Sequence, residues 1–175
     1  MIIDLEKIQD LPFEWSETLH LEAEQLEHFE LLELGEISWQ GRVERLVPGF
    51  LLRARANYDQ TLACVCCLEA WRRPVEAEVE LMVIVGTAEP ATGEYELSES
   101  DLALHFIEED KLDTMPLVRE QVELNLPMRA LCKEDCAGIC PRCGANRNET
   151  DCDCEESEPD PRWSALQQLK DPERG

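Results

Sequence analysis

The sequence predicts an α+β fold: an antiparallel β-sheet or partly open barrel with one packed helix, followed by a cysteine-rich C-terminal appendage. A two-residue apolar alternation between residues 37 and 85 predicts the sheet, and an amphipathic segment after Asp113 predicts the helix. Residues 132–154 hold six cysteines and almost no apolar side chains. We therefore expect a sheet-plus-helix domain over 1–131 and a cysteine-rich, metal-binding tail with a short terminal helix over 132–175.

The N-terminal segment predicts two short strands and a helix. The strands fall within residues 1–21, one on each side of Pro12, because proline interrupts a strand. Residues 21–34 carry Leu26, Phe29 and Leu32 among many glutamates. This pattern favours a short helix that stops at Gly35.

Three strands are predicted where apolar residues occupy every second position. The first covers 37–44, and a Val-Pro-Gly turn at 47–49 leads into a return strand over 50–57. The third covers 75–85, with six apolar residues on one face and three glutamates on the other. Consecutive strands with short connections form an antiparallel meander that has one face in water.

The segment after the meander predicts a loop over 86–100 and a short strand over 105–107. A helix of about three turns then follows Asp113, which suits an N-cap, with Pro116 tolerated in the first turn. Apolar residues at spacings of three and four give this helix one face that packs on the sheet.

The C-terminus predicts a second, shorter helix over 161–170. Its apolar stripe would dock either on this domain or on a partner, because a terminal segment stays ordered only when it is tied down. The stripe consists of Trp163, Leu166 and Leu169.

The net charge of the chain is −23, from 39 acidic and 16 basic residues. Such a surface repels nucleic-acid phosphates and attracts basic partners. Only the middle of the chain, 37–85, is balanced, and its six arginines are the first candidates for a phosphate contact. The alternative is that they pair with neighbouring glutamates on an exposed sheet face. The six are Arg42, Arg45, Arg53, Arg55, Arg72 and Arg73.

The N-terminus has no basic region followed by a long apolar stretch, and no segment approaches the about 18 apolar residues of a membrane span. We therefore expect a cytoplasmic protein that does not contact the membrane. Because the cytoplasm is reducing, nine cysteines there favour metal or redox chemistry over structural disulfides.

The cysteine spacings indicate two four-sulfur metal sites, with zinc as the expected ion. The first would combine a pair at a turn between strands with a pair just after the helix. The second would combine a C-x-x-C-G knuckle with the C-x-C pair eight residues beyond it. The first set is Cys64, Cys67, Cys132 and Cys136, and the second is Cys140, Cys143, Cys152 and Cys154.

Other pairings of these cysteines stay open. Cys132 and Cys136 can share one ion with Cys140 and Cys143 instead, and iron–sulfur ligation needs the same residues. Cys66 is left over from the two-site partition, which matches an odd total of nine cysteines. A thioredoxin-type dithiol requires a C-x-x-C at the start of a helix, whereas this pair lies among antiparallel strands.

No enzyme motif is present in the sequence. Three histidines, His20, His28 and His105, are isolated, and there is neither a phosphate-cradling glycine loop nor a nucleophile elbow. The sequence therefore predicts a protein without catalytic residues.

Three stretches, in one order across residues 40–170, resemble the YceD family. They are the corner CVCCLE at 64–69, the stretch LCKEDCAGICPRCGAN at 131–146 with its preceding Leu-Pro, and DPRWSAL at 160–166. The resemblance implies a bacterial factor needed for accumulation of large-subunit (23S) ribosomal RNA, with no established catalytic residue. Cys66 departs from the corner's usual pattern by adding a third sulfur.

From charge and resemblance together, we expect a non-enzymatic ribosome biogenesis factor. Its partner would be a basic large-subunit ribosomal protein or a pre-ribosomal particle, bound through acidic surface. Two alternatives are a zinc-dependent RNA-binding module that uses the 37–85 arginines, and a dithiol redox or metal-handling protein.

Overall fold

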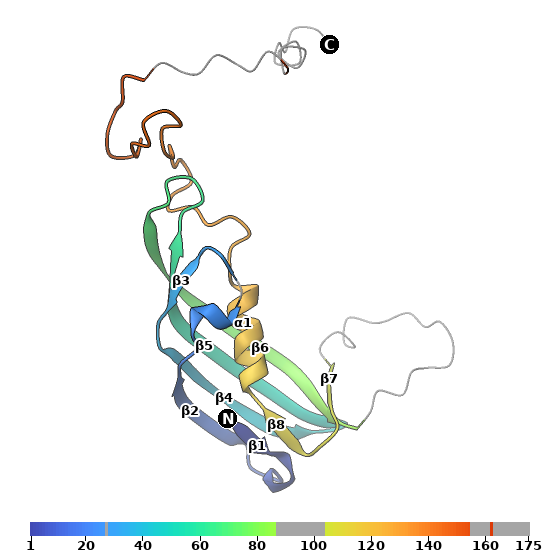
Figure 1. Cartoon of the computed structure of the whole chain (residues 1–175). Helices are drawn as coiled ribbons and strands as arrows, with labels where there is room; N and C mark the ends of the chain where they lie inside the picture. The colour runs from blue at the N-terminus through green and yellow to red at the C-terminus, as the bar shows by residue number, and fades with distance from the viewer. Residues whose placement is uncertain (27, 87–103, 155–161, 163–175) are drawn as a thin grey trace, which may run out of the picture.

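The computed structural model describes residues 1–26, 28–86, 104–154 and 162. A curved sheet dominates this part of the chain, and one helix crosses it (Figure 1). The strands are β1 (Ile2–Asp4), β2 (Phe13–Leu19), β3 (Leu31–Leu34), β4 (Ile37–Leu46), β5 (Gly49–Ala63), β6 (Ala70–Val85), β7 (Leu104–Ile107) and β8 (Lys111–Asp113). The helices are the 3₁₀ turns η1 (Leu5–Lys7) and η2 (Ala23–Leu26) and the α-helix α1 (Met115–Leu124).

The larger sheet follows the order β2-β4-β5-β6-β7, with β3 added beside β5. Strands β4, β5 and β6 form the predicted antiparallel meander, and β5 pairs with β6 without a register shift from Phe50–Val83 to Ala63–Ala70. Strand β7 lies parallel to the C-terminal end of β6, a pairing that the sequence did not indicate. The α+β prediction, with its sheet, packed helix and cysteine-rich C-terminal region, is confirmed.

The two-residue alternation separates the faces of the sheet. Trp39, Val43, Leu52 and Val83 are fully buried on the inner face. The opposite positions of β5 and β6 carry exposed arginines and glutamates. Because successive side chains of a strand point to opposite faces, this pattern leaves one face for the core and one for water.

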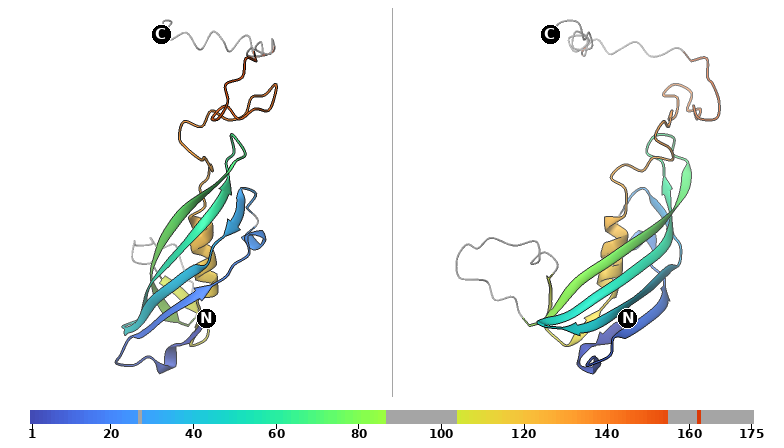
Figure 2. Two further views of the ribbon diagram at one scale, coloured as in Figure 1. Left: turned by 90° about the vertical axis from the view of Figure 1, so that its left-hand side faces the viewer. Right: turned by 180° about the vertical axis from the view of Figure 1, so that it is seen from behind.

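Helix α1 covers the inner face, and Figure 2 shows it lying along the curved sheet from two further directions. Its residues Leu117, Val118 and Val122 are buried in the core. The predicted N-cap is wrong by one residue: Thr114 holds that position and makes no side-chain cap hydrogen bond. Asp113, one residue earlier, still contacts the first turn, since its Oδ1 accepts a 3.0 Å hydrogen bond from the Met115 N–H. The β1–β8 pair holds the N-terminus against the start of the helix.

The predicted helix over 21–34 is wrong. This segment contains the short turn η2 and then β3, which pairs with β5 between Leu31–Leu62 and Leu34–Gln60. The reason is that β5 continues beyond Asn57, the last residue that β4 covers, so its edge is available to β3. Tertiary pairing overrides a short helical pattern. The predicted loop after Gly86, apart from Gly86 itself, and the terminal helix over 161–170, apart from Arg162, lie outside the described residues.

We predict that Gly41→Ala destabilises the sheet by about 1–3 kcal/mol because the inner face has no room for a methyl group. A Cβ at this position would lie 2.7 Å from Trp15 Cζ2 and 2.6 Å from the Arg53 carbonyl oxygen. Gly35→Ala is the control, since its Cβ would meet its nearest atom, the Asp59 carbonyl oxygen, at 3.4 Å. Urea unfolding of the two variants measures their stability, and equal midpoints would contradict the predicted clash at Gly41.

Candidate metal centres

The first cysteine cluster joins two distant parts of the chain. Cys64 and Cys67 lie in the β5–β6 turn, and Cys132 and Cys136 lie in the segment after α1. All four sulfurs are within 4.8 Å of one another. The Cys64–Cys136 and Cys67–Cys132 sulfur pairs are each 3.7 Å apart.

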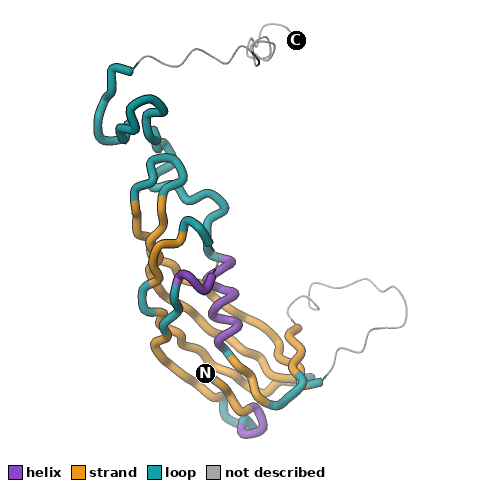
Figure 3. The backbone as a smooth tube through the Cα atoms, viewed as in Figure 1, coloured by secondary structure: helices purple, strands orange, loops and turns teal. Residues whose placement is uncertain are grey.

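The path of α1 explains why these sulfurs meet. The helix runs along the sheet toward the β5–β6 turn, and the chain leaves it there (Figures 1 and 3). The Val65 N–H then donates a 2.8 Å hydrogen bond to the carbonyl oxygen of Ala130, two residues before Cys132. This backbone hydrogen bond holds the returning segment against the turn without a metal ion.

The second cluster is local. Cys140, Cys143, Cys152 and Cys154 all come from one 15-residue stretch, and their sulfurs are also within 4.8 Å of one another. This stretch has no regular helix or strand among its described residues and is drawn as loop in Figure 3. Cys140 is buried, whereas Cys143 is exposed. Cys66 belongs to neither cluster.

The two C-x-x-C turns have the same backbone design. The Gly144 N–H donates to the Cys140 carbonyl oxygen at 2.9 Å, and the Leu68 N–H donates to that of Cys64 at the same distance. Both donors are left-handed, with φ of 75° at Gly144 and 64° at Leu68. Glycine adopts this conformation freely, but a leucine is strained in it.

The segment that leads into the Cys140–Gly144 turn is hydrogen-bonded to the Cys64–Leu68 turn. The Ile139 N–H donates to the Cys66 carbonyl oxygen at 3.1 Å, and the Arg147 N–H donates to Gly138 at 2.9 Å. Asn148 reaches back from the second loop, with its Nδ2 3.3 Å from the Cys136 sulfur. Sequence reasoning missed this asparagine and Leu68, although the C-x-x-C-L corner differs visibly from the C-x-x-C-G knuckle.

The sulfur geometry of the first cluster fits one tetrahedral ion. Zinc–sulfur bonds of about 2.3 Å in a regular tetrahedron place the sulfurs about 3.8 Å apart. The 3.7 Å separations in the first cluster match that edge. They are far longer than a disulfide bond of about 2.05 Å. Each set of four cysteines can therefore hold a metal ion, and a four-sulfur set suits zinc.

The protonation of the thiols is uneven within each cluster. Burial opposes ionisation of Cys64, but backbone N–H groups, led by that of Cys132, donate to its sulfur and bring its pKa down to about 6. The backbone N–H of Cys143 similarly lowers the pKa of Cys140 to about 6. Burial raises the pKa of Cys132 to about 12, and a thiol–sulfur contact with Cys143 raises that of Cys154 to about 12. Ion binding must therefore release protons.

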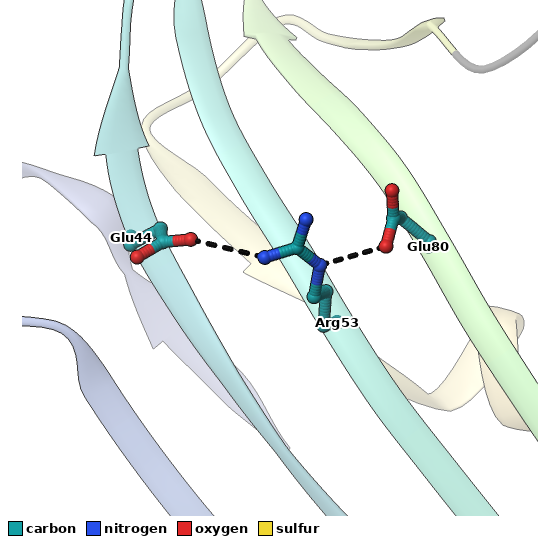
Figure 4. Close-up of polar contacts among 3 residues, drawn as sticks. All are labelled: Glu44, Arg53 and Glu80. Atoms are coloured by element: carbon teal, nitrogen blue, oxygen red, sulfur yellow. Dashed lines mark hydrogen bonds and ion pairs between the residues drawn. The ribbon is translucent and has the colours of Figure 1, made fainter.

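Three of the six arginines proposed as phosphate contacts are held in ion pairs. Figure 4 shows Arg53 between two carboxylates, with Nε 2.7 Å from Glu80 and Nη1 3.4 Å from Glu44. Arg55 contacts Glu78 and lies 3.1 Å from Glu76, and Arg72 contacts Asp59. Each of the three is neutralised by a neighbour on the sheet.

The other three arginines lie apart from one another. Arg45 stacks over Phe50, with its guanidinium carbon 5.6 Å from the ring centroid. Arg42 is exposed on β4, and Arg73 is half-buried on β6. The proposed docking stripe, Trp163, Leu166 and Leu169, lies outside the described residues.

The fold and site define a class of protein: an acidic, curved-sheet protein that carries two four-cysteine clusters at one end. A family profile described as large ribosomal RNA subunit accumulation protein YceD matches residues 52–170. This match spans more than half of the chain. The chain belongs to the YceD family.

Individual relatives cover most of the chain at low identity. An uncharacterized protein of Mycobacterium tuberculosis is 27% identical over 99% of this chain and 83% of its own length. The uncharacterized protein YlbN of Bacillus subtilis is 23% identical over 96% and 94%. An Arabidopsis thaliana protein named large ribosomal RNA subunit accumulation protein YCED homolog 1, chloroplastic, is 38% identical over 39% of this chain and 22% of its own length.

No solved structure is a significant match to this chain. Among the described residues, no helix is both long enough and apolar enough to cross a membrane.

We predict that the purified protein carries two zinc ions per chain, and that each cluster loses its ion independently. Cys64→Ser/Cys67→Ser and Cys140→Ser/Cys143→Ser should each lower the content to one, because the remaining cluster keeps its four sulfurs. Elemental analysis of chelator-free protein measures this. Cys66→Ser is the matched control and should retain two ions. An ion lost from the control, or two ions kept by either double variant, would refute the partition.

We predict that Leu68→Gly stabilises the zinc-loaded protein by about 0.5–1 kcal/mol, because glycine adopts the left-handed conformation without strain. Leu68 is 66% exposed, so little packing is lost with its side chain. Leu68→Ala removes the same side chain but keeps the strain, and it should show no gain. Urea midpoints for the two variants decide the matter, and a loss of stability in the glycine variant would show that the side chain is needed.

Proposed function

We propose that this protein is a non-enzymatic factor that supports the accumulation of large-subunit ribosomal RNA. The observation that carries the proposal is the family match over residues 52–170, together with plant relatives whose names state this role. The zinc expected at both clusters would act structurally. Four sulfur ligands fill the coordination of a tetrahedral ion and leave no position for a substrate or an activated water.

The partner that we propose is a basic large-subunit ribosomal protein or a pre-ribosomal particle that exposes one. Charge supports this choice, because a chain with a net charge of −23 attracts basic surfaces and repels bare phosphate. The ion pairs of the arginines also support a protein partner. Moving Arg53 or Arg55 to a phosphate would leave behind the glutamates that they now neutralise. These observations disfavour an RNA-binding face on the sheet.

The acidic surface would act by shielding the basic protein until ribosomal RNA replaces it. Opposite net charges speed the encounter of the two proteins, and salt weakens the attraction between them. Such an attraction suits a transient complex. The cysteine clusters would keep the C-terminal part of the chain in one shape while this exchange takes place.

We predict that depleting the protein in the cells that make it lowers free large subunits and their ribosomal RNA, while spare small subunits persist. Sucrose-gradient profiles and ribosomal RNA quantification measure this. Re-expression of Cys66→Ser should restore the profile, whereas Cys64→Ser/Cys67→Ser should not if the first cluster is required. Unchanged subunit profiles after depletion would remove the proposed role.

A further inference from the structure

Most of one long edge of the sheet has no paired strand among the described residues. Strand β6 pairs with β5 along nearly its whole length, but β7 covers only Met82–Val85 on the other side. No residue within 1–26, 28–86 or 104–154 pairs with positions 70–81 of β6 on that side. Figure 1 shows β7 beside the end of β6 only. The pairing with β5 has no bulge, so this edge is regular.

Two observations identify which backbone groups face this edge. The Gly86 N–H donates to Ile107 at 2.8 Å, and therefore even-numbered residues direct their backbone toward the β7 side. Pro74 has no N–H and fits the same set, because a proline is tolerated where its nitrogen faces away from the ladder. Between Arg72 and Glu80, the N–H groups that face this edge and have no partner among the described residues are those of Arg72, Glu76, Glu78 and Glu80.

The side chains beside this edge are acidic and exposed. The side chains of Glu76, Glu78 and Glu80 are 61%, 70% and 63% exposed. Their arginine partners, Arg53 and Arg55, come from β5, on the far side from the edge. An extended chain repeats its side chains every second residue, which is the spacing of these carboxylates.

We propose that the β6 edge from Arg72 to Glu80 receives an extended basic segment of the partner protein as an added strand. Main-chain hydrogen bonds would supply affinity, and Lys or Arg at alternate positions would lie opposite the glutamates. The inference rests on the proposed function for the identity of the partner. The same glutamates, with Pro74, keep a second acidic copy of this chain from pairing there.

The first test uses the full zinc-loaded chain and a synthetic peptide of alternating Lys and Val. Binding should slow amide hydrogen exchange at Arg72, Glu76, Glu78 and Glu80 at least tenfold. Binding without protection at these amides would overturn the proposal. So would amides that are already protected in the free chain, because the edge would then be occupied by the protein's own residues.

A matched peptide separates strand addition from simple charge attraction. Methylation of alternate backbone nitrogens, on the side that faces the edge, leaves the charge unchanged and removes the hydrogen bonds. Its affinity should fall at least tenfold in calorimetry at fixed salt. Equal affinity for the methylated and unmethylated peptides would show that the glutamates attract the peptide without pairing.

The matched protein variants are Glu78→Pro and Glu78→Gln. Proline removes an N–H that the β5 ladder does not use, so the fold should survive and peptide binding should fall at least tenfold. Glutamine keeps the N–H and should weaken binding less, with a smaller salt dependence. If Glu78→Pro still captures ribosomal proteins and rescues depleted cells, the edge is not the site, although the proposed function stands. If Glu78→Pro fails to fold, the comparison of methylated and unmethylated peptides on the unmodified protein still tests strand addition.

Discussion

The return of Cys132 and Cys136 to the β5–β6 turn is the constraint on which the rest of the structure depends. Strands β5 and β6 continue past the last residue that β4 covers, and β3 is the described strand that pairs with β5 there. A two-stranded projection is marginally stable by itself. Four sulfurs gather at its tip, and an ion held by both segments would fasten the projection to the chain that leaves α1. The length of the β5–β6 hairpin and the direction of α1 together determine that the four sulfurs meet.

Charge is used differently on the two sides of this molecule. On the outer face of the sheet, two arginines of β5 pair with four glutamates of β4 and β6, so acidic charge remains beside the β6 edge. Most of the excess acid lies elsewhere in the chain, and the N-terminal 36 residues alone hold eleven acidic and one basic side chain. The net excess of acid favours a basic protein over bare nucleic acid as a partner.

The sequence was informative where one period or one spacing governs a whole segment. The alternation over 37–85 predicted three strands, and the cysteine spacings predicted the same two groups of four that the structure brings together. The sequence-based prediction failed where a segment's structure depends on which strand edge in the sheet is unpaired. Residues 31–34 became a strand because β5 offered an unpaired edge, and β7 runs parallel to β6 for reasons that no local pattern carries. Likewise, the domain boundary predicted at 131–132 stays a prediction, and the first cluster takes two cysteines from each side of it.

The separation of the sulfurs along the chain has a consequence for biosynthesis. Cys64 and Cys136 are 72 positions apart, so a nascent polypeptide cannot complete the first centre until nearly the whole sheet and its helix have emerged from the exit tunnel. The second centre needs only a 15-residue stretch that is translated afterwards. Metal binding would therefore be a late event in synthesis, and a chain truncated before residue 132 would lack the two cysteines that join Cys64 and Cys67 at the hairpin tip.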